Sequence, residues 1–406
     1  MPLLPEELFK MALNVQDPWF VKKIDFSPHT KQLDIWIDFT PGSKFDCSEC
    51  DTSGCSPYDT SDKTWRHLNF FQFKTYLHCR VPRVQYSICG IHQVKIPWAR
   101  EQSGFTLWMD ALIVILARKM TISAIAGHID EHDTRIWRVV GHYVEEARSE
   151  QDFSTVTAVG IDETACTRGH KYVSLVVNLE NSKVIHISKG KDASVVSSFK
   201  EDFSLHDGKP ENIQQFCCDM SPAFIKGIEE NFPTASITFD KFHVMKIMNE
   251  AVDAVRREEQ AVNHALNKTR FIWLKNPNNL TILQQKQLGS LKDMNLKTMR
   301  AYNIKISLAG FWSVLDPNVA LAYLNKWYFW ATHSKLKPIV KAAKTMKRHW
   351  EGIMNYIRSR ISNGVLEGIN SIVQSLKASA RGYKNIDNFM TMIFLRCGDL
   401  NFRLPT

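Results

Sequence analysis

The chain has 406 residues, of which 44% are hydrophobic and 23% charged, a composition typical of a folded protein with two to four domains. Its longest purely apolar run, residues 111–117, is too short to span a bilayer, and its N-terminus lacks the features of a signal peptide, so we expect a cytoplasmic protein. The net charge of +9 favours a polyanionic partner, because neutralising phosphates releases counterions.

Residues 1–104 predict an N-terminal β module with zinc-ribbon-like cysteines. Cys47 and Cys50 have the C-x2-C spacing of one zinc knuckle. Cys89 is the predicted third ligand of a structural Zn²⁺ ion, and the fourth stays open among Cys55, Cys79 and His92. The alternative is a metal-free module, since free cysteines also pack as small hydrophobic residues.

Residues 105–150 predict a helix-turn-helix. Thr121 is placed to cap a short helix that ends near residue 129, and a second helix is predicted at 135–143 after a polar turn. The second helix of such a pair enters the major groove of DNA, so we expect Arg135 and Arg138 to face DNA. The residues expected to pack inward are Ile136, Val139 and Val140. The alternative is an ordinary helical hairpin.

Residues 151–248 alternate strand and helix patterns, as in an α/β sheet. Asp162 ends one apolar run and Asp219 ends another, and between them lie predicted strands at 172–179 and 183–188 and a helix at 193–202. Three strands, a helix and a fourth strand are the order of an RNase H-like core, in which the first and fourth strands are neighbours. We therefore expect both aspartates at one edge of the sheet, although a lone aspartate there is usually a turn residue.

Residues 359–406 form the predicted C-terminal helices of this core. Glu367 is one of only two acidic residues among eleven basic ones between Lys335 and Lys384, which argues against an ordinary solvated glutamate. Its helix has a polar stripe opposite an apolar face. Asp162, Asp219 and Glu367 are thus candidate catalytic ligands for a pair of Mg²⁺ or Mn²⁺ ions.

Two further residues follow another predicted strand. Asp240 and His243 are auxiliary candidates: His243 to contact a phosphate or orient a carboxylate, or else merely to cap the next helix. The sequence has no Walker loop, Gly-rich dinucleotide turn or HExxH motif, which disfavours ATP-driven and nicotinamide chemistry.

Residues 249–358 predict an almost wholly helical segment. Most of its tryptophans are expected in a helical core, with base stacking as the alternative. Basic residues there and just beyond Glu367 are candidates for contact with the DNA backbone: Lys341, Lys344, Lys347, Arg348, Arg381 and Lys384.

Eight stretches spread over nearly the whole chain carry a resemblance to a known family. They are TWRHL at 64–68, VPRV at 81–84, PWAR at 97–100, GIDET at 160–164, DMSPAF at 219–224, FDKFHV at 239–244, WATHS at 330–334 and SNGVLEGIN at 362–370. With these the chain resembles the bacterial insertion-sequence DDE transposases of the ISL-three (ISL3) family. Members usually carry cysteine where this chain has Tyr86, so the second half of the zinc site departs from the family pattern.

The resemblance implies that Asp162, Asp219 and Glu367 are the DDE triad and that an all-helical insertion interrupts the core. It also likens Asp240 and His243 to the aspartate-x2-histidine signature of such cores. We therefore expect a transposase, a homodimer on double-stranded DNA, that binds terminal inverted repeats, cleaves the ends and joins the 3′-hydroxyl to target DNA. The alternatives are a metal-dependent nuclease without strand transfer and a catalytically dead DNA-binding regulator.

Overall fold

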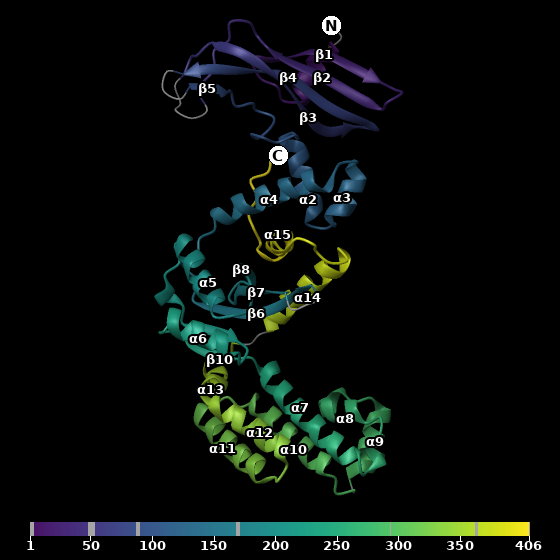
Figure 1. Cartoon of the computed structure of the whole chain (residues 1–406), viewed down its shortest axis with the longest axis vertical. Helices are drawn as coiled ribbons and strands as arrows, with labels where there is room; N and C mark the ends of the chain where they lie inside the picture. The colour runs from purple at the N-terminus through teal and green to yellow at the C-terminus, as the bar shows by residue number, and fades with distance from the viewer. Residues whose placement is uncertain are drawn as a thin grey trace. The chain divides into compact units, whose positions relative to one another are not determined.

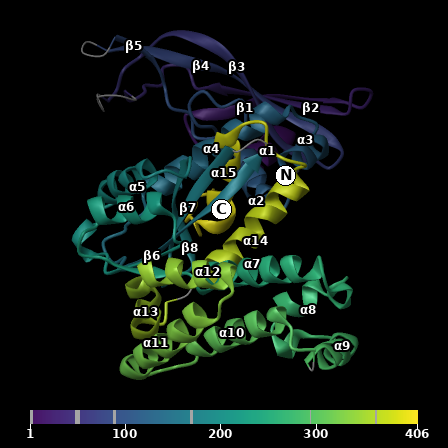
Figure 2. The same cartoon turned by 60° about the horizontal axis from the view of Figure 1, so that its bottom comes forward.

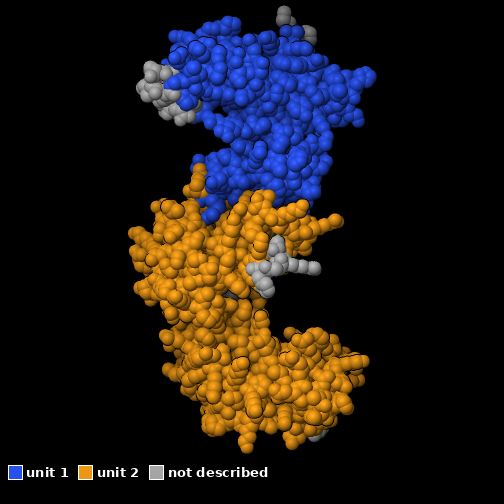
Figure 3. Space-filling view, viewed as in Figure 1, with its two compact units in different colours: residues 1–148, 401–406 blue, residues 149–400 orange. Residues whose placement is uncertain are grey.

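We describe the fold from a computed structural model, which defines residues 4–47, 53–86, 90–167, 171–292, 294–361 and 364–405. The chain forms two compact units, residues 1–148 with 401–406 and residues 149–400, coloured separately in Figure 3. The described part of the chain contains no helix long and apolar enough to cross a membrane.

The first unit begins with a mostly antiparallel sheet whose strands follow the order β1-β2-β4-β3, with β5 added beside β4 (Figure 1). Alternate residues of β2, Leu33, Ile35 and Ile37, are fully buried, as expected for a strand with one face on a core. The elements are α1 (Pro5–Ala12), β1 (Trp19–Ser27), β2 (Gln32–Phe39), β3 (Pro57–Phe70), β4 (Phe73–Tyr86) and β5 (Gly90–Gln93).

Three helices complete the first unit: α2 (Leu107–Ala117), α3 (Ile122–Ile129) and α4 (Asp133–Ser149). The Thr121 hydroxyl accepts a hydrogen bond from the Ala124 amide, as predicted for the cap of α3. Asp130 ends α3 in the left-handed conformation and so starts the turn. The second helix of the pair, α4, is longer than predicted, and its inward residues Ile136, Val139 and Val140 are buried.

The second unit is built on a five-stranded sheet of order β10-β9-β6-β7-β8. Strands β6, β9 and β10 are parallel to one another, whereas β7 and β8 run antiparallel to their neighbours. The strands are β6 (Ala158–Thr167), β7 (Lys171–Asn178), β8 (Lys183–Lys189), β9 (Gln215–Cys218) and β10 (Ser236–Phe239).

Helices cover both faces of this sheet. Val159 and Ile161 of β6 join the core that contains Phe199 of helix α5, whereas Gly160 between them meets Leu366 of helix α14. Successive side chains of a strand point to opposite faces, so the face of β6 that carries Gly160 also carries Asp162. The helices around the sheet are α5 (Ser194–Leu205), α6 (Pro222–Asn231), α14 (Gly364–Ser379) and α15 (Ile386–Cys397), with a 3₁₀ turn η1 (Pro210–Asn212).

Between β10 and α14 the chain forms a helical group, reached from the sheet by the long helix α7 (Figures 1 and 2). Trp273, Trp312 and Trp327 are buried in it, whereas Trp330 is exposed. The buried Lys305 ammonium donates to three carbonyls at the end of α8. The helices are α7 (Lys241–Gln260), α8 (Arg270–Leu274), α9 (Ile282–Lys292), α10 (Lys297–Phe311), α11 (Pro317–His333), α12 (Lys337–Arg348) and α13 (Trp350–Ser359), with 3₁₀ turns η2 (His264–Leu266) and η3 (Pro277–Asn279).

Candidate active site

The register of the three parallel strands places three aspartates on one face of the sheet. Gly160 of β6 pairs with Cys217 of β9, and Cys217 pairs with Thr238 of β10. Asp162, Asp219 and Asp240 each lie two residues beyond one of these partners, so they share one sheet face near the carboxyl ends of neighbouring strands. Asp162 does not end its strand as the sequence pattern predicted, because β6 continues to Thr167 in its pairing with β7.

Helix α14 brings Glu367 to the same face of the sheet. Its polar side chains bond to successive positions of β6: Asn370 Nδ2 donates to Asp162 Oδ2 at 2.7 Å, and Gln374 Nε2 donates to the Thr164 hydroxyl at 2.7 Å. Lys377 Nζ donates to the Ala165 carbonyl at 2.8 Å. Polar side chains of α14 therefore bond to β6 beside the apolar contact of Leu366 with Gly160.

The carboxylates are close enough to perturb one another. Burial raises the pKa of Asp162, and the nearby Asp219 charge acts in the same direction. Burial likewise raises the pKa of Glu367, with further contributions from Asp240 and Asp162. Like charges that converge in this way disfavour each other's ionised form unless a cation lies between them.

Asp240 and His243 form a pair at the start of α7. The buried Asp240 carboxylate accepts from the Phe242 amide at 3.1 Å and lies 2.9 Å from His243 Nδ1. The hydrogen bond to Asp240 raises the pKa of His243, and the charges of Asp219 and Asp162 add to this shift. Asp240 therefore both caps α7 and fixes one ring nitrogen of His243, which leaves Nε2 as the other polar atom of the ring.

The acidic side chains at this edge offer carboxylate oxygens, which are the ligands that hard divalent cations prefer. Within the described ranges, however, no three His, Cys, Asp or Glu side chains lie close enough together to hold a metal ion. The predicted ligands therefore share a region of the sheet without forming a closed ligand shell.

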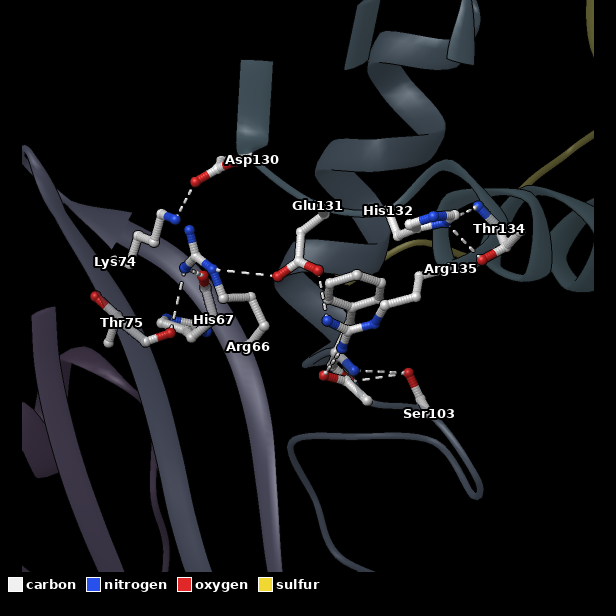
Figure 4. Close-up of polar contacts among 12 residues, drawn as sticks. Arg66, His67, Lys74, Thr75, Ser103, Asp130, Glu131, His132, Thr134 and Arg135 are labelled. Atoms are coloured by element: carbon white, nitrogen blue, oxygen red, sulfur yellow. Dashed lines mark hydrogen bonds and ion pairs between the residues drawn. The ribbon is translucent and has the colours of Figure 1, made fainter. Parts of the chain in front are cut away.

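In the first unit, ion pairs connect the turn between α3 and α4 to strands β3 and β4 of the sheet (Figure 4). Glu131, in the turn, pairs with the buried Arg66 of β3 and with Arg135 of α4. Lys74 of β4 pairs with Asp130 at the start of the turn. These pairs connect the helix pair to the neighbouring sheet, and the sequence pattern alone gave no signal of them.

The predicted DNA-facing arginines of α4 lie in different surroundings. The Arg135 guanidinium donates to the Gly104 carbonyl at 2.9 Å and lies 4.1 Å from the centre of the Phe105 ring, with 36% of its side chain exposed. Arg138, one turn further on, is exposed. Arg138 is thus the freer of the two for a ligand.

The other predicted DNA contacts lie in the second unit. Lys341, Lys344, Lys347 and Arg348 are exposed on α12, and together with Tyr328 they line a hollow of about 790 Å³. Two more lysines, Lys335 and Lys337, line it, and none of the described residues that line it is acidic. Arg381 and Lys384 are exposed just beyond α14.

The cysteine predictions are only partly within the described residues, because Cys50 and Cys89 lie outside them. Cys47 is buried in the core of the first unit. Of the candidates for a fourth ligand, Cys79 is in the same core, and burial raises the pKa of its thiol to about 12. Cys55 pairs with Phe45 in an isolated bridge.

Comparisons with known proteins place the chain in a family. The family model for ISL3-type DDE proteins, described as "Transposase", matches residues 159–393, and that for the "Helix-turn-helix domain of transposase family ISL3" matches residues 94–144. The chain is 25% identical over 361 residues to the transposase for insertion sequence element IS1001 of Bordetella parapertussis, covering 86% of this chain and 87% of that protein. It is also 25% identical over 376 residues to the transposase for insertion sequence element IS1557 of Mycobacterium tuberculosis, covering 84% and 83%.

These matches, over the α/β sheet and over the helix-turn-helix before it, identify the protein as a DNA transposase. The chain belongs to the ISL3 family of DDE transposases, since the family model covers more than half of it.

Proposed function

We propose that this transposase binds the terminal inverted repeats of its insertion sequence, cuts the ends by metal-dependent hydrolysis and joins the freed 3′-hydroxyl to target DNA by transesterification. The observation that supports the proposal is that Asp162 and Asp219 lie on one face of the five-stranded sheet, near enough to each other and, for Asp162, to Glu367 for their charges to interact. The order of the five described strands, in which β7 runs opposite to the other four, supports an RNase H-like core.

In the proposed site, Asp162, Asp219 and Glu367 hold Mg²⁺ or Mn²⁺. When bound, such ions supply charge stabilisation at the phosphate and lower the pKa of the attacking hydroxyl. Asp240 holds His243 in one orientation, so that His243 is placed to donate a hydrogen bond to a phosphate oxygen. The raised pKa of His243 favours its protonated form, which suits a contact with an anion.

DNA recognition is assigned to the rest of the chain. Helix α4 reads the element end, chiefly through Arg138, from the helix-turn-helix at residues 105–150. The sheet module at residues 1–104 holds Zn²⁺ through Cys47, Cys50, Cys89 and one more ligand. The insertion at residues 249–358, between core segments 151–248 and 359–406, holds the DNA backbone through α12. Because two ends must be paired, the proposal includes a homodimer on DNA, and it includes a cytoplasmic location.

The first test compares Asp162→Ala with the wild type on DNA that carries the native element ends. Cleavage is expected to fall at least about 100-fold, because a lost metal ligand removes charge stabilisation in the transition state. End binding, measured by gel shift, is expected to stay within about twofold. Glu229→Ala, on the exposed face of α6, is the control and should keep full cleavage.

The alternative, a nuclease without strand transfer, is separated by supplying pre-cleaved ends with a free 3′-hydroxyl and a target plasmid. A transposase gives joined products in Mg²⁺, whereas a nuclease gives none. Equal loss of binding and cleavage in Asp162→Ala would show instead that Asp162 is structural.

A further inference from the structure

Asn370 lies on α14 one turn after Glu367, and its side-chain amide lies against a predicted metal ligand. Asn370 Nδ2 donates to Asp162 Oδ2 at 2.7 Å, while the Glu163 amide donates to Asp162 Oδ1 at 2.8 Å. Both oxygens of this carboxylate are therefore held, one by its own strand and one by the helix that carries Glu367.

The same hydrogen bond fixes the orientation of the Asn370 amide. An ionised carboxylate only accepts hydrogen bonds, so the NH₂ group must face Asp162 and the carbonyl oxygen must face away from it. That carbonyl oxygen, Oδ1, is buried and has no hydrogen-bond partner among the described residues. Buried carbonyl oxygens rarely lack a hydrogen-bond donor, so we infer that this oxygen interacts with a bound ligand.

The chemistry around Asn370 limits what that ligand is. A carbonyl oxygen accepts from a donor or binds a hard cation, and its neighbours are the carboxylates of Asp162 and, one turn earlier on α14, Glu367. A hydrated divalent cation suits both kinds of group, because its bound water donates to Oδ1 while the carboxylates neutralise its charge.

We propose that Asn370 is a positioning residue of the metal site: it orients Asp162 through Nδ2 and receives a water of the bound cation at Oδ1. The inference rests on the proposed function, since it takes Asp162 as a metal ligand. It assigns to α14 a second role beside carrying Glu367, because the helix sets the geometry of a ligand on β6.

Gln374 offers a matched control for this proposal. It lies one turn further along α14, and its amide makes the same kind of bond, at the same distance of 2.7 Å, to Thr164 of the same strand. Gln374→Ala therefore removes a bond of the same kind between α14 and β6 as Asn370→Ala does, but it removes no bond to Asp162.

The experiment measures Mn²⁺ binding to the full chain without DNA by calorimetry, and the Mg²⁺ concentration for half-maximal nicking of end DNA. Asn370→Ala is expected to weaken Mn²⁺ binding by about tenfold or more and to raise the Mg²⁺ requirement in parallel, as residues that orient metal ligands do. Gln374→Ala is expected to change both by less than about twofold. Asn370→Asp keeps an oxygen but loses the donor, so it is expected to lose nicking as Asn370→Ala does.

Equal effects of the Asn370 and Gln374 variants, or unchanged Mn²⁺ binding in both Asn370 variants, would overturn the proposal. Thermal unfolding shows whether each variant folds. If Asn370→Ala does not fold, the near-isosteric Asn370→Asp variant is used to test the proposal. Asp162→Ala in the same assays separates the proposed function from the role of Asn370. If Asp162→Ala still cleaves DNA, the proposed function is wrong. If Asp162→Ala is inactive and Asn370→Ala behaves like the wild type, only the role of Asn370 is wrong.

Discussion

At the scale of single residues, burial keeps the imidazole of His67 in the first unit uncharged. Its Nδ1 atom lies 2.8 Å from the Thr106 hydroxyl, which caps α2, and burial beside Arg66 lowers the pKa of His67 to about 4. The imidazole is therefore neutral in the folded protein at pH 5, whereas in the unfolded chain it is mostly protonated.

This difference predicts a pH dependence of stability. As pH falls from about 6.5 to 4, the unfolded chain takes up a proton at His67 that the folded protein does not. This should lower the free energy of unfolding by about 1–3 kcal/mol over that pH range and leave it unchanged above pH 6.5. His67→Gln keeps a polar partner for Thr106 without titrating, so its urea midpoint should fall less between pH 7.5 and pH 4.5 than that of the wild type. Parallel curves for the two proteins would refute the assignment.

Arg135 and Arg138 predict a second contrast between neighbouring residues. Arg138→Ala should weaken binding to end DNA by about 1–3 kcal/mol while leaving stability unchanged, because the side chain is exposed. Arg135→Ala should destabilise the first unit by about 1–3 kcal/mol, because it leaves Glu131 with fewer partners and uncovers Phe105. Fluorescence anisotropy and thermal melting of both variants check this, and a stable Arg135→Ala with lost DNA binding would reverse the roles.

At the scale of elements, the seating of α14 on β6 depends on the lack of a side chain at position 160. A Cβ atom on Gly160 would lie 2.6 Å from Leu366 Cδ1 and 2.9 Å from Leu179 Cδ2. Leu366 and Leu179 are therefore packed against the strand backbone, and this close packing places Glu367 one residue along the helix.

Gly160→Ala should therefore move α14 outward. We expect a loss of about 1–3 kcal/mol in stability from overpacking. We also expect cleavage to fall at least about tenfold, because small misplacements of catalytic groups are costly. Gly289→Ala on α9 is the control, since nothing lies within 4 Å of its added Cβ atom and a helical Gly→Ala change is favourable. Unchanged cleavage by Gly160→Ala would mean that the site does not require this close packing.

At the scale of the whole molecule, the net charge of +9 is accompanied by a cluster of positive charge beside α12. Six cationic residues line the hollow there, and none of its described lining residues is acidic. Binding of the DNA backbone there should release counterions and so depend steeply on salt.

The double variant Lys344→Gln/Lys347→Gln should reduce the slope of log K against log salt by about 2, because each lost phosphate contact removes about 0.9 from it. Lys286→Gln/Lys292→Gln removes the same charge from exposed positions on α9 and serves as the control. Binding of end DNA is measured from low to moderate salt by anisotropy. Equal changes in the two double variants would show that only total charge matters.

Local pattern was enough to predict many elements of this protein. The alternation of apolar residues, the threonine cap of α3 and the strand that ends just before Asp219 all depend on neighbours within a few positions, and the structure has each of them. The prediction for Arg135 shows the limit of such reasoning, because its exposure depends on Gly104 and Phe105, about thirty residues away.

Short motifs in the sequence were enough to predict the residue types of the candidate site and the family to which the chain belongs. Which of these residues lie together depends on the folded chain: the strand register places Asp240 in line with Asp162 and Asp219, and Asn370 bonds to Asp162 across 208 positions. The physical reason is that register and helix docking are set by packing between distant segments, which no local spacing encodes.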